Sequence, residues 1–348
     1  MADLAEGCFI SKGIMIARTP LSWQSDDWQQ ELAAGYRRPA ELLAALEIAP
    51  ERIGGGVDFD SPFPMRVPRA YARRMRRGDP ADPLLRQVLP LADERQPAPG
   101  FSADPVGDHA ARRGAGVLHK YRGRALLITT GACAVHCRYC FRRHFPYAEE
   151  HAADNEWQDA VSVIAGDDSL REVILSGGDP LSLTTPRLAR LVQRLEAIPH
   201  VRRLRLHTRL PIVLPARIED GLLELLARGR LKPVMVVHAN HPNEIDDEVG
   251  AALARLSGAG ITLFNQSVLL RGVNDDAAIL TALSEALFEA GVTPYYLHLL
   301  DRVQGAAHFE VDLDTARALH RQLRANLPGY LVPQLVQELA GEAFKRPV

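Results

Sequence analysis

The chain has few cysteines and no long apolar run. Only four of its 348 residues are cysteines, and no apolar stretch approaches the ~20 residues that a membrane-spanning helix needs. Its start, MADLAEGCFISKG, lacks a basic segment followed by an unbroken apolar one, so no secretory signal is expected. We therefore expect a cytoplasmic protein without a membrane partner, in which the isolated Cys8 is an ordinary thiol.

Neither sign of charge dominates. The 41 Lys and Arg residues nearly balance the 43 Asp and Glu residues, for a net charge of -2. Such a chain has no overall basic field that would attract nucleic acid, so small molecules are the expected partners. One local basic run, Arg73, Arg74, Arg76 and Arg77, could be a nucleic-acid patch, a solvated helix face or a contact with the rest of the protein. The near-neutral chain favours the last two.

Repeats at solenoid periods and low-complexity segments are also missing. From about residue 124, short β-branched runs alternate with stretches of helical periodicity. The expected strands are Arg124–Thr130, Arg171–Ser176, Arg202–Thr208, Lys232–His238, Thr262–Leu270 and Thr293–Leu300. The expected helices are Glu156–Ala165, Pro186–Ile198 with Thr185 as its cap, Glu219–Ala227, Asp246–Leu256, Asp276–Ala290 and Leu313–Leu327.

Strands that alternate with helices predict a parallel sheet with right-handed crossovers, and six units are too few to close an eight-stranded barrel. The fold class is therefore α/β, a partial (β/α)6 TIM-like barrel. Residues 1–110, with two helices near Asp27–Gly35 and Pro39–Leu46, are expected to form a mainly helical N-terminal extension. The barrel is placed at 111–330 and a separate C-terminal segment at 331–348.

Three cysteines, Cys133, Cys137 and Cys140, lie in one loop after the first expected strand, with the spacing CxxxCxxC. Disulfides between such close neighbours are geometrically poor, so metal ligation is the better interpretation. Three thiolates can hold three irons of a four-iron cluster and leave the fourth iron open. The alternative is a zinc ion with His136 or His144 as fourth ligand, although zinc sites usually draw on two separated ligand pairs.

A CxxxCxxC loop after strand one of a six-unit β/α chain resembles the radical S-adenosylmethionine superfamily. In that superfamily, S-adenosylmethionine binds the open iron of a 4Fe-4S cluster. The stretch Leu175-Ser-Gly-Gly-Asp179 resembles the superfamily's GGE motif, with Asp in place of Glu. The resemblance implies that Ser176, Gly177, Gly178 and Asp179 lie at the methionine part of S-adenosylmethionine.

Several further stretches resemble lysine 2,3-aminomutases, over about residues 110 to 348. They are Cys140-Phe-Arg-Arg-His144, His207-Thr-Arg-Leu-Pro211, His241-Pro-Asn-Glu-Ile245, Asn265-Gln-Ser-Val-Leu-Leu270 with Gly272-Val-Asn274, and Pro294-Tyr-Tyr-Leu297 leading to Asp301. Their order and spacing favour kinship over coincidence. The resemblance implies an isomerase that converts L-lysine to (R)-β-lysine with a 4Fe-4S cluster, S-adenosylmethionine and pyridoxal 5'-phosphate.

The same resemblance assigns cofactor contacts to individual residues. Lys345, in the ending Gly341-Glu-Ala-Phe-Lys345-Arg-Pro-Val, matches the lysine that carries pyridoxal phosphate, although Gly341 alone remains of the family's glycine-rich run. Tyr121 and Arg124 match the segment that lines this coenzyme. Residues at the ends of the fourth and fifth strands match the S-adenosylmethionine pocket; they are His238, Asn240 and Gln266.

Substrate contacts follow from the resemblance too. Arg142 matches the residue that holds the substrate carboxylate, which a guanidinium can bind with two hydrogen bonds. Asp301 and Glu338 match two acids that hold the distal ammonium, and Glu338 is one methylene longer than the family's Asp. Two acids facing one ammonium favour a basic amino acid over glutamate.

The implied reaction begins when an electron from an unidentified donor, passed through the cluster, cleaves S-adenosylmethionine. The radical so formed takes a hydrogen from carbon 3 of lysine while pyridoxal phosphate holds the amino group. Shorter family members make (R)-β-lysine that a lysyl ligase attaches to elongation factor P. The segment Gly78-Asp-Pro-Ala-Asp-Pro-Leu-Leu-Arg-Gln and the short tail after Lys345 resemble that group.

Two alternatives stay open. One is a lysine or arginine 2,3-aminomutase of catabolism or secondary metabolism. The other, from a different class, is a non-catalytic metal-binding interaction protein in which Lys345 is idle.

Overall fold

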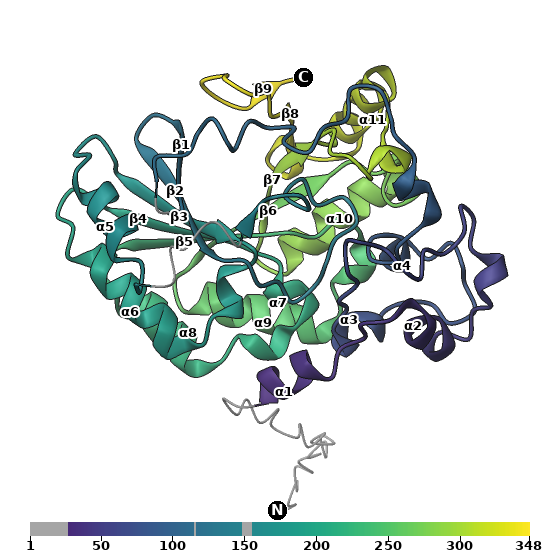
Figure 1. Ribbon diagram of the computed structural model, residues 1–348, viewed down its shortest axis with the longest axis horizontal. Helices are drawn as coiled ribbons and strands as arrows, with labels where there is room; N and C mark the ends of the chain where they lie inside the picture. Colours follow the sequence, from purple (N-terminus) through teal and green to yellow (C-terminus); the bar gives the residue numbers. More distant parts are fainter. Residues whose placement is uncertain (1–26, 115, 148–154) are drawn as a thin grey trace, which may run out of the picture.

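The computed structural model describes residues 27–114, 116–147 and 155–348, so Cys8 lies outside the described residues. Within that part of the chain, one nine-stranded sheet forms the centre, and its strands follow each other in chain order from β1 to β9. Strands β2 to β8 are parallel, while β1 and β9 run antiparallel to their neighbours. Because β1 and β9 end the strand order, the barrel is open on one side (Figure 1).

The strands confirm the expected β/α core and add three that the sequence did not predict. They are β1 (Val117–Tyr121), β2 (Arg124–Thr130), β3 (Glu172–Gly177), β4 (Arg203–Thr208), β5 (Lys232–Val237), β6 (Thr262–Val268), β7 (Thr293–His298), β8 (Gln334–Gln337) and β9 (Arg346–Pro347). Strands β2 to β7 are the six expected ones. The unexpected strands border the opening, and each is too short to show a clear apolar pattern.

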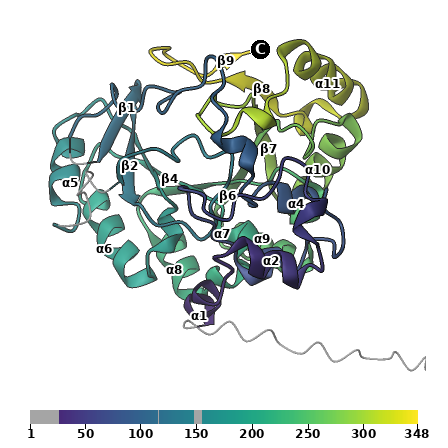
Figure 2. The same cartoon turned by 45° about the vertical axis from the view of Figure 1, so that its right-hand side comes forward.

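The helices cover the outer face of the curved sheet (Figures 1 and 2). The six that follow the strands are α5 (Gln158–Ala165), α6 (Thr185–Glu196), α8 (Asp220–Arg228), α9 (Asp247–Gly258), α10 (Ala277–Glu289) and α11 (Leu313–Asn326). The N-terminal extension holds α1 (Asp27–Ala33), α2 (Pro39–Ala45), α3 (Arg69–Ala72) and α4 (Pro83–Arg86), and the short α7 (Leu210–Val213) follows β4. The predicted helical character of the extension is confirmed.

One local prediction is wrong. Thr185 does not cap α6, because the helix begins at Thr185 itself and Thr184 occupies the capping position without a side-chain hydrogen bond. The hydroxyl of Thr185 donates instead to Glu219, which lies just before α8. Pro186 still lies in the first turn, where its missing N–H leaves no helical hydrogen bond unmade.

A single buried cluster joins the N-terminal extension to the barrel. Leu42 and Leu84 of the extension belong to the same apolar core as Leu127 and Val173 of the sheet, and all four are fully buried. Burying one such side chain stabilises the fold by about 1.5–3 kcal/mol. The extension is therefore part of the folded core and can hold side chains against the barrel.

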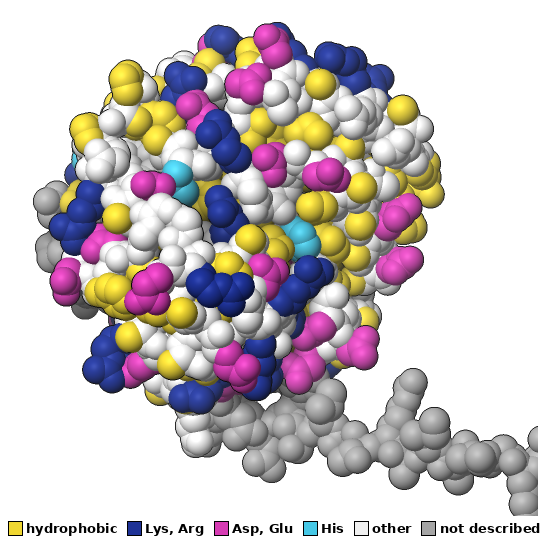
Figure 3. Space-filling model, turned by 90° about the vertical axis from the view of Figure 1, so that its right-hand side faces the viewer, with side chains coloured by type: hydrophobic (Ala, Val, Ile, Leu, Met, Phe, Trp, Pro, Cys, Tyr) yellow, Lys and Arg dark blue, Asp and Glu magenta, His cyan; other side chains and the backbone are white. Residues whose placement is uncertain are grey.

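The basic run contacts the barrel. Arg74 donates to the carbonyl oxygens of Ile212 (2.6 Å) and Glu244, and its guanidinium lies over the ring of Tyr71. Arg73 pairs with Glu248 on α9 at 3.4 Å. On the face shown in Figure 3, basic and acidic side chains are interspersed. Arg73 and Arg74 thus contact the barrel, as one interpretation expected, whereas Arg76 and Arg77 are exposed.

Candidate active site

A cavity of about 450 Å³ extends along the carboxyl-terminal ends of the strands, within the usual range for small-molecule sites. Its wall contains every residue that the sequence assigned to the site except Asn240. These wall residues are Tyr121, Arg124, Cys133, Cys137, Cys140, Arg142, Ser176, Gly177, Gly178, Asp179, His238, Gln266, Asp301, Glu338 and Lys345. Asn240 lies behind the wall, where it donates to the hydroxyl of Tyr139 at 2.7 Å.

The three cysteines of the loop after β2 are free thiols on one side of this cavity. Burial raises the pKa of Cys140 to about 11 and the pKa of Cys133 well above its usual value. Thiols bind metal as thiolates, so a metal must displace the protons of Cys133 and Cys140 when it binds. Three thiols outside disulfides on one wall fit the three-cysteine ligation of a 4Fe-4S cluster.

The two histidines considered for zinc have other partners. The Nδ1 atom of His136 lies 2.8 Å from the carbonyl oxygen of Pro64, and its ring stacks on Phe63. The Nε2 atom of His144 lies 3.0 Å from the carbonyl oxygen of Gln304. In the described ranges, no three His, Cys, Asp or Glu side chains are arranged to hold one metal ion. One ring nitrogen of each histidine therefore lies within hydrogen-bonding distance of a backbone carbonyl oxygen.

Two glycines let the end of β3 lie against the cysteine loop. Gly177 has a φ of +118°, and a Cβ there would lie 2.7 Å from the carbonyl oxygen of Thr130. A Cβ on Gly178 would lie only 2.2 Å from the carbonyl oxygen of Ala132. The backbone N–H of Gly178 donates to the carbonyl oxygen of Thr130 at 2.7 Å, and the backbone N–H of Asp179 donates to the carbonyl oxygen of Ala132 at 2.8 Å. The close approach of two backbones explains the glycine pair physically.

We expect Gly178→Ala to lose most of its cluster, because the added methyl group must push the cysteine loop away from β3. Iron and sulfide per chain after anaerobic reconstitution measure the effect. Gly250→Ala is the matched control: nothing lies within 4 Å of its Cβ position on α9, and alanine is favoured in a helix by about 1 kcal/mol. Full iron content in Gly178→Ala would show that the loop tolerates the displacement.

The carboxylate of Asp179 binds protein donors. One oxygen accepts from the backbone N–H of Leu181 (3.0 Å) and the hydroxyl of Thr208 (2.7 Å), and the other accepts from the backbone N–H of Arg209 (2.7 Å). Burial raises the pKa of Asp179 to about 6, and these hydrogen bonds oppose the rise. Asp179 therefore fixes the loops after β3 and β4 at the cavity wall.

A buried polar network lies behind Cys137. The Nη1 atom of Arg209 donates to Cys137 Sγ at 2.8 Å, and its Nη2 atom donates to Gln87 Oε1 (2.6 Å), Glu244 Oε2 (2.9 Å) and the hydroxyl of Tyr71 (3.2 Å). Gln87 and Tyr71 come from the N-terminal extension. The extension thereby holds an arginine against a cluster cysteine, a link that no local motif indicated.

An acid of the extension holds the other side of the cysteine loop. Glu94 lies in a short 3-10 helix (Ala92–Arg95) and accepts from Arg138 Nε at 2.8 Å and from Arg143 Nη2 at 2.6 Å. Arg138 is fully buried and also donates to the carbonyl oxygen of Phe63 at 2.8 Å. Hydrogen bonds to charged groups are worth about 1.5–3 kcal/mol each. Contacts of this strength fix the loop that carries the cysteines.

Five side chains of alternating charge cross the open side of the barrel, and we call them the charge row. Arg142 Nε lies 2.7 Å from Asp108 Oδ2, and Asp108 Oδ1 lies 2.6 Å from Lys120 Nζ. Lys120 Nζ lies 3.0 Å from Glu338 Oε1, and the other oxygen of Glu338 pairs with Lys345 Nζ. The row connects the segment before β1 and β1 itself with the segment between β8 and β9.

The two acids assigned to the substrate ammonium differ in charge state. Burial alone would raise the pKa of Glu338, but Lys345 and Lys120 outweigh it and hold that pKa well below its usual value. For Asp301, burial and the neighbouring Glu338 together raise the pKa to about 7, against the opposing effect of Lys345 and Lys120. The Asp301 side chain forms no ion pair within the described part of the chain, so it is the acid that lacks a cation.

Two wall histidines were not assigned a role from the sequence. His207 is the last but one residue of β4, and His298 is the last residue of β7. Both line the cavity, and their Nε2 atoms are buried and, among the described residues, unpartnered. Burial lowers the pKa of both imidazoles, so both are neutral. Buried polar atoms normally have a partner, so these two nitrogens favour a polar ligand in the cavity.

Comparisons with known proteins agree with this geometry. The Radical SAM superfamily matches residues 127–283, which run from β2 into α10. An L-lysine 2,3-aminomutase of Escherichia coli is 52% identical over 93% of this chain and 94% of its own. Those of Haemophilus influenzae (46%; 95% and 98%) and Acetoanaerobium sticklandii (34%; 93% and 78%) are also similar.

The partial barrel with its cysteine loop defines an enzyme that uses a 4Fe-4S cluster and S-adenosylmethionine. The chain belongs to the L-lysine 2,3-aminomutase family, a family of isomerases within the radical S-adenosylmethionine superfamily. The resemblance found in the sequence is confirmed. Among the described helices, none is long and apolar enough to cross a membrane.

Proposed function

We propose that this chain converts L-lysine to (R)-β-lysine, with pyridoxal phosphate attached to Lys345. One observation carries the proposal: Arg142, Asp301 and Glu338 line the same cavity as the three cysteines and Lys345. An amino acid with a cationic side chain needs a cation for its carboxylate and an anion for its distal ammonium. The cavity supplies both, beside the ligands of the cluster.

The residues of the chain bind the substrate at both ends and exclude water. Arg142 offers its guanidinium to the carboxylate, and Asp301 offers an acceptor that lacks a cation to the ammonium. When bound, the cluster with S-adenosylmethionine supplies radical chemistry, and pyridoxal phosphate supplies the π system through which nitrogen moves. Fixing both ends of lysine places its carbon 3 relative to these groups, which is the protein's contribution to rate.

The part of the cavity near Lys345 fits an anionic aromatic coenzyme. Tyr121 and Arg124 stand at the turn between β1 and β2, where the guanidinium lies 4.7 Å from the centre of the tyrosine ring. The unpartnered imidazole nitrogens of His207 and His298 face the same cavity. Tyr121 and Arg124 would both contact this coenzyme, as the resemblance implies.

Asp301→Asn is expected to lower kcat/KM for L-lysine about 30-fold or more, because removing one partner of a buried charge typically costs about 2–5 kcal/mol. The pKa of Asp301 is raised to about 7, so its negative charge is present above that pH and is lost as the pH falls below it. The KM of the unaltered enzyme for lysine should therefore rise as the pH falls through about 7.

In Asp301→Asn this pH dependence should disappear, while iron content and coenzyme binding stay normal. Steady-state assays across the pH range, with iron and pyridoxal phosphate determined on the same preparations, provide the measurement. If Asp301→Asn turned over lysine as well as the unaltered enzyme, the assignment of Asp301 to the substrate ammonium would be wrong.

Substrate choice tests the proposed function. The reconstituted enzyme should form β-lysine from L-lysine under anaerobic conditions with S-adenosylmethionine and a reductant. L-Glutamate should give little product, because its side-chain carboxylate would face Asp301 and Glu338. A clear preference for L-arginine or L-glutamate would contradict the proposal, even with an intact cluster.

We propose further that the product serves the β-lysylation of elongation factor P through its lysyl ligase. The segment Gly78–Gln87, which resembles the elongation factor P group, includes α4 and ends in Gln87 of the network behind Cys137. Mass spectrometry of elongation factor P incubated with its ligase and the enzyme's product tests this step. The modification should be more extensive with that product than with L-lysine. Equal extents of modification would indicate that the product has another use.

A further inference from the structure

Asp108 is a buried acid that belongs to none of the motifs. Only 1% of its surface is exposed, and it lies in the segment before β1. The carboxylate of Asp104 accepts from the backbone N–H groups of Asp108 (2.8 Å) and His109 (3.0 Å), which fixes this turn. Hydrogen bonds within its own loop therefore fix the backbone at Asp108, independently of its contacts with other elements.

The two oxygens of Asp108 bind two cations from different elements. Oδ2 accepts from Arg142 Nε at 2.7 Å, and Oδ1 pairs with Lys120 Nζ at 2.6 Å. Burial alone would raise the pKa of Asp108, but Arg142 and Lys120 outweigh it and lower that pKa. The carboxylate is therefore ionised, and it balances both cations inside the protein.

The contact with Asp108 determines how Arg142 is oriented. Its Nε atom is held by Asp108, its Nη1 atom donates to the hydroxyl of Ser176 at 3.1 Å, and its guanidinium lies over the ring of Phe141. These contacts fix both the plane and the rotation of the guanidinium. Of its five N–H groups, one on Nη1 and both on Nη2 have no partner among the described residues, and they are available to a ligand in the cavity that Arg142 lines.

We propose that Asp108 is a positioning residue for the substrate carboxylate, which it serves by holding the guanidinium of Arg142 in the orientation that binds it. The inference rests on the proposed function, since it takes an amino acid as the ligand of Arg142. A guanidinium that is already fixed loses less rotational freedom when it binds the carboxylate. The entropy of ordering the Arg142 side chain is then lost during folding and does not weaken substrate binding.

Asp108→Asn preserves the shape of the side chain and removes its charge. The test compares equilibrium binding of L-lysine and of 1,5-diaminopentane, which is lysine without its carboxylate, to the enzyme loaded with pyridoxal phosphate. S-adenosylmethionine and reductant are left out, so nothing turns over, and the visible absorption of the coenzyme reports binding. The dissociation constant for lysine should rise about tenfold or more, while that for the diamine stays within about twofold.

Two further variants separate positioning from general damage. Asp58→Asn is the matched control, because Asp58 is a buried acid paired with Arg95 through two hydrogen bonds (2.7 and 2.8 Å) outside the cavity. It should leave both dissociation constants unchanged. Asp108→Glu keeps the charge but moves it by one methylene, so lysine binding should weaken less than in Asp108→Asn while diamine binding stays the same. This variant also serves as the test if Asp108→Asn does not fold.

The possible outcomes distinguish this inference from the proposed function. Equal weakening of lysine and diamine binding, or unchanged lysine binding in both Asp108 variants, would overturn the positioning role. In that case the unaltered enzyme would still prefer lysine to the diamine. If the unaltered enzyme showed no such preference, the assignment of Arg142 to the substrate carboxylate would fail, and with it both proposals.

Discussion

Replacing Cys133, Cys137 or Cys140 with alanine is expected to remove the cluster and abolish all turnover. Each thiolate holds one iron, and two remaining cysteines cannot support a four-iron cluster with one open site. The three thiols lie on one wall of the cavity. Iron and sulfide per chain and the broad visible absorption of the reconstituted protein measure the loss.

Cys8→Ala is the control for this series, because Cys8 stands far from the motif in the sequence. It should retain iron, colour and activity. Full iron content and activity in any one of the three loop variants would refute the assignment of that cysteine. A protein that binds one zinc ion in place of iron would refute the cluster itself.

Lys345→Ala is expected to abolish turnover while leaving the cluster intact. The Nζ atom of Lys345 reaches the cavity, where it pairs with Glu338, and the cysteines lie on other elements. A covalent bond to the aldehyde of pyridoxal phosphate needs this amine, so the variant should lose the visible absorption of the attached coenzyme. Iron content should equal that of the unaltered protein, which separates loss of the coenzyme from loss of the cluster.

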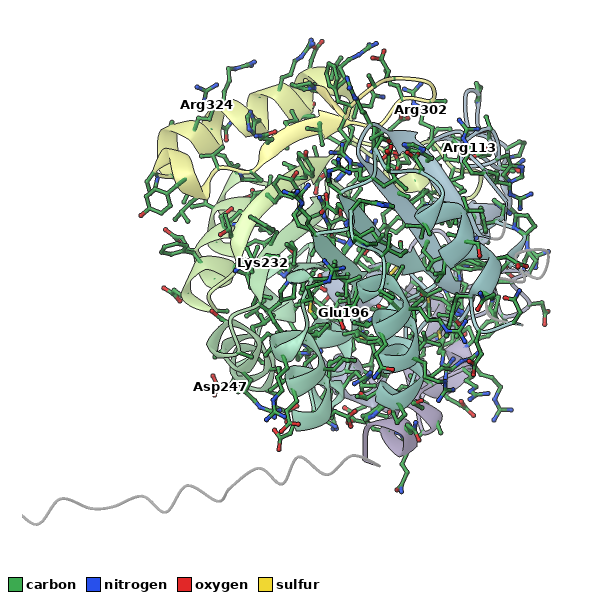
Figure 4. The ribbon with its side chains drawn as sticks, turned by 90° about the vertical axis from the view of Figure 1, so that its left-hand side faces the viewer. Arg113, Glu196, Lys232, Asp247, Arg302 and Arg324 are labelled. Carbon is green, nitrogen blue, oxygen red and sulfur yellow. The ribbon has the colours of Figure 1, made fainter. Side chains whose placement is uncertain are left out.

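Reduction with borohydride followed by peptide mapping tests the same assignment directly. The label should appear on Lys345. Lys232 is a suitable comparison, because it is exposed at the start of β5, on the outer face of the molecule (Figure 4). A label on Lys120 or Lys232, in place of Lys345, would contradict the assignment.

The sequence predicted the parallel core well, because strands β2 to β7 are short apolar or alternating runs separated by periodic helices. It did not predict β1, β8 and β9, which are only five, four and two residues long. Those three strands form the borders of the open side and bring Lys120, Glu338 and Lys345 together. Their pairing depends on the edges that the barrel offers, a tertiary effect that short local patterns do not carry.

The site was predictable where a motif carried its residues and not where distant segments meet. The cysteines, Arg142 and Lys345 stand in recognisable stretches, and the cavity contains them all. Gln87, in contrast, donates to Glu244 across 157 positions of sequence. A buried polar side chain must find a partner, but its sequence neighbours do not indicate which one. Asp108 escaped prediction for the same reason.

The most direct test of the account uses L-lysine labelled with ¹⁵N on its α-amino group in an anaerobic reaction. The account predicts β-lysine that carries the label on carbon 3, formed only when iron, S-adenosylmethionine, pyridoxal phosphate and a reductant are all present. Mass spectrometry and ¹⁵N NMR of the product locate the label. The account would be contradicted if a protein with full iron and coenzyme formed no β-lysine, or if the β-lysine it formed had lost the label.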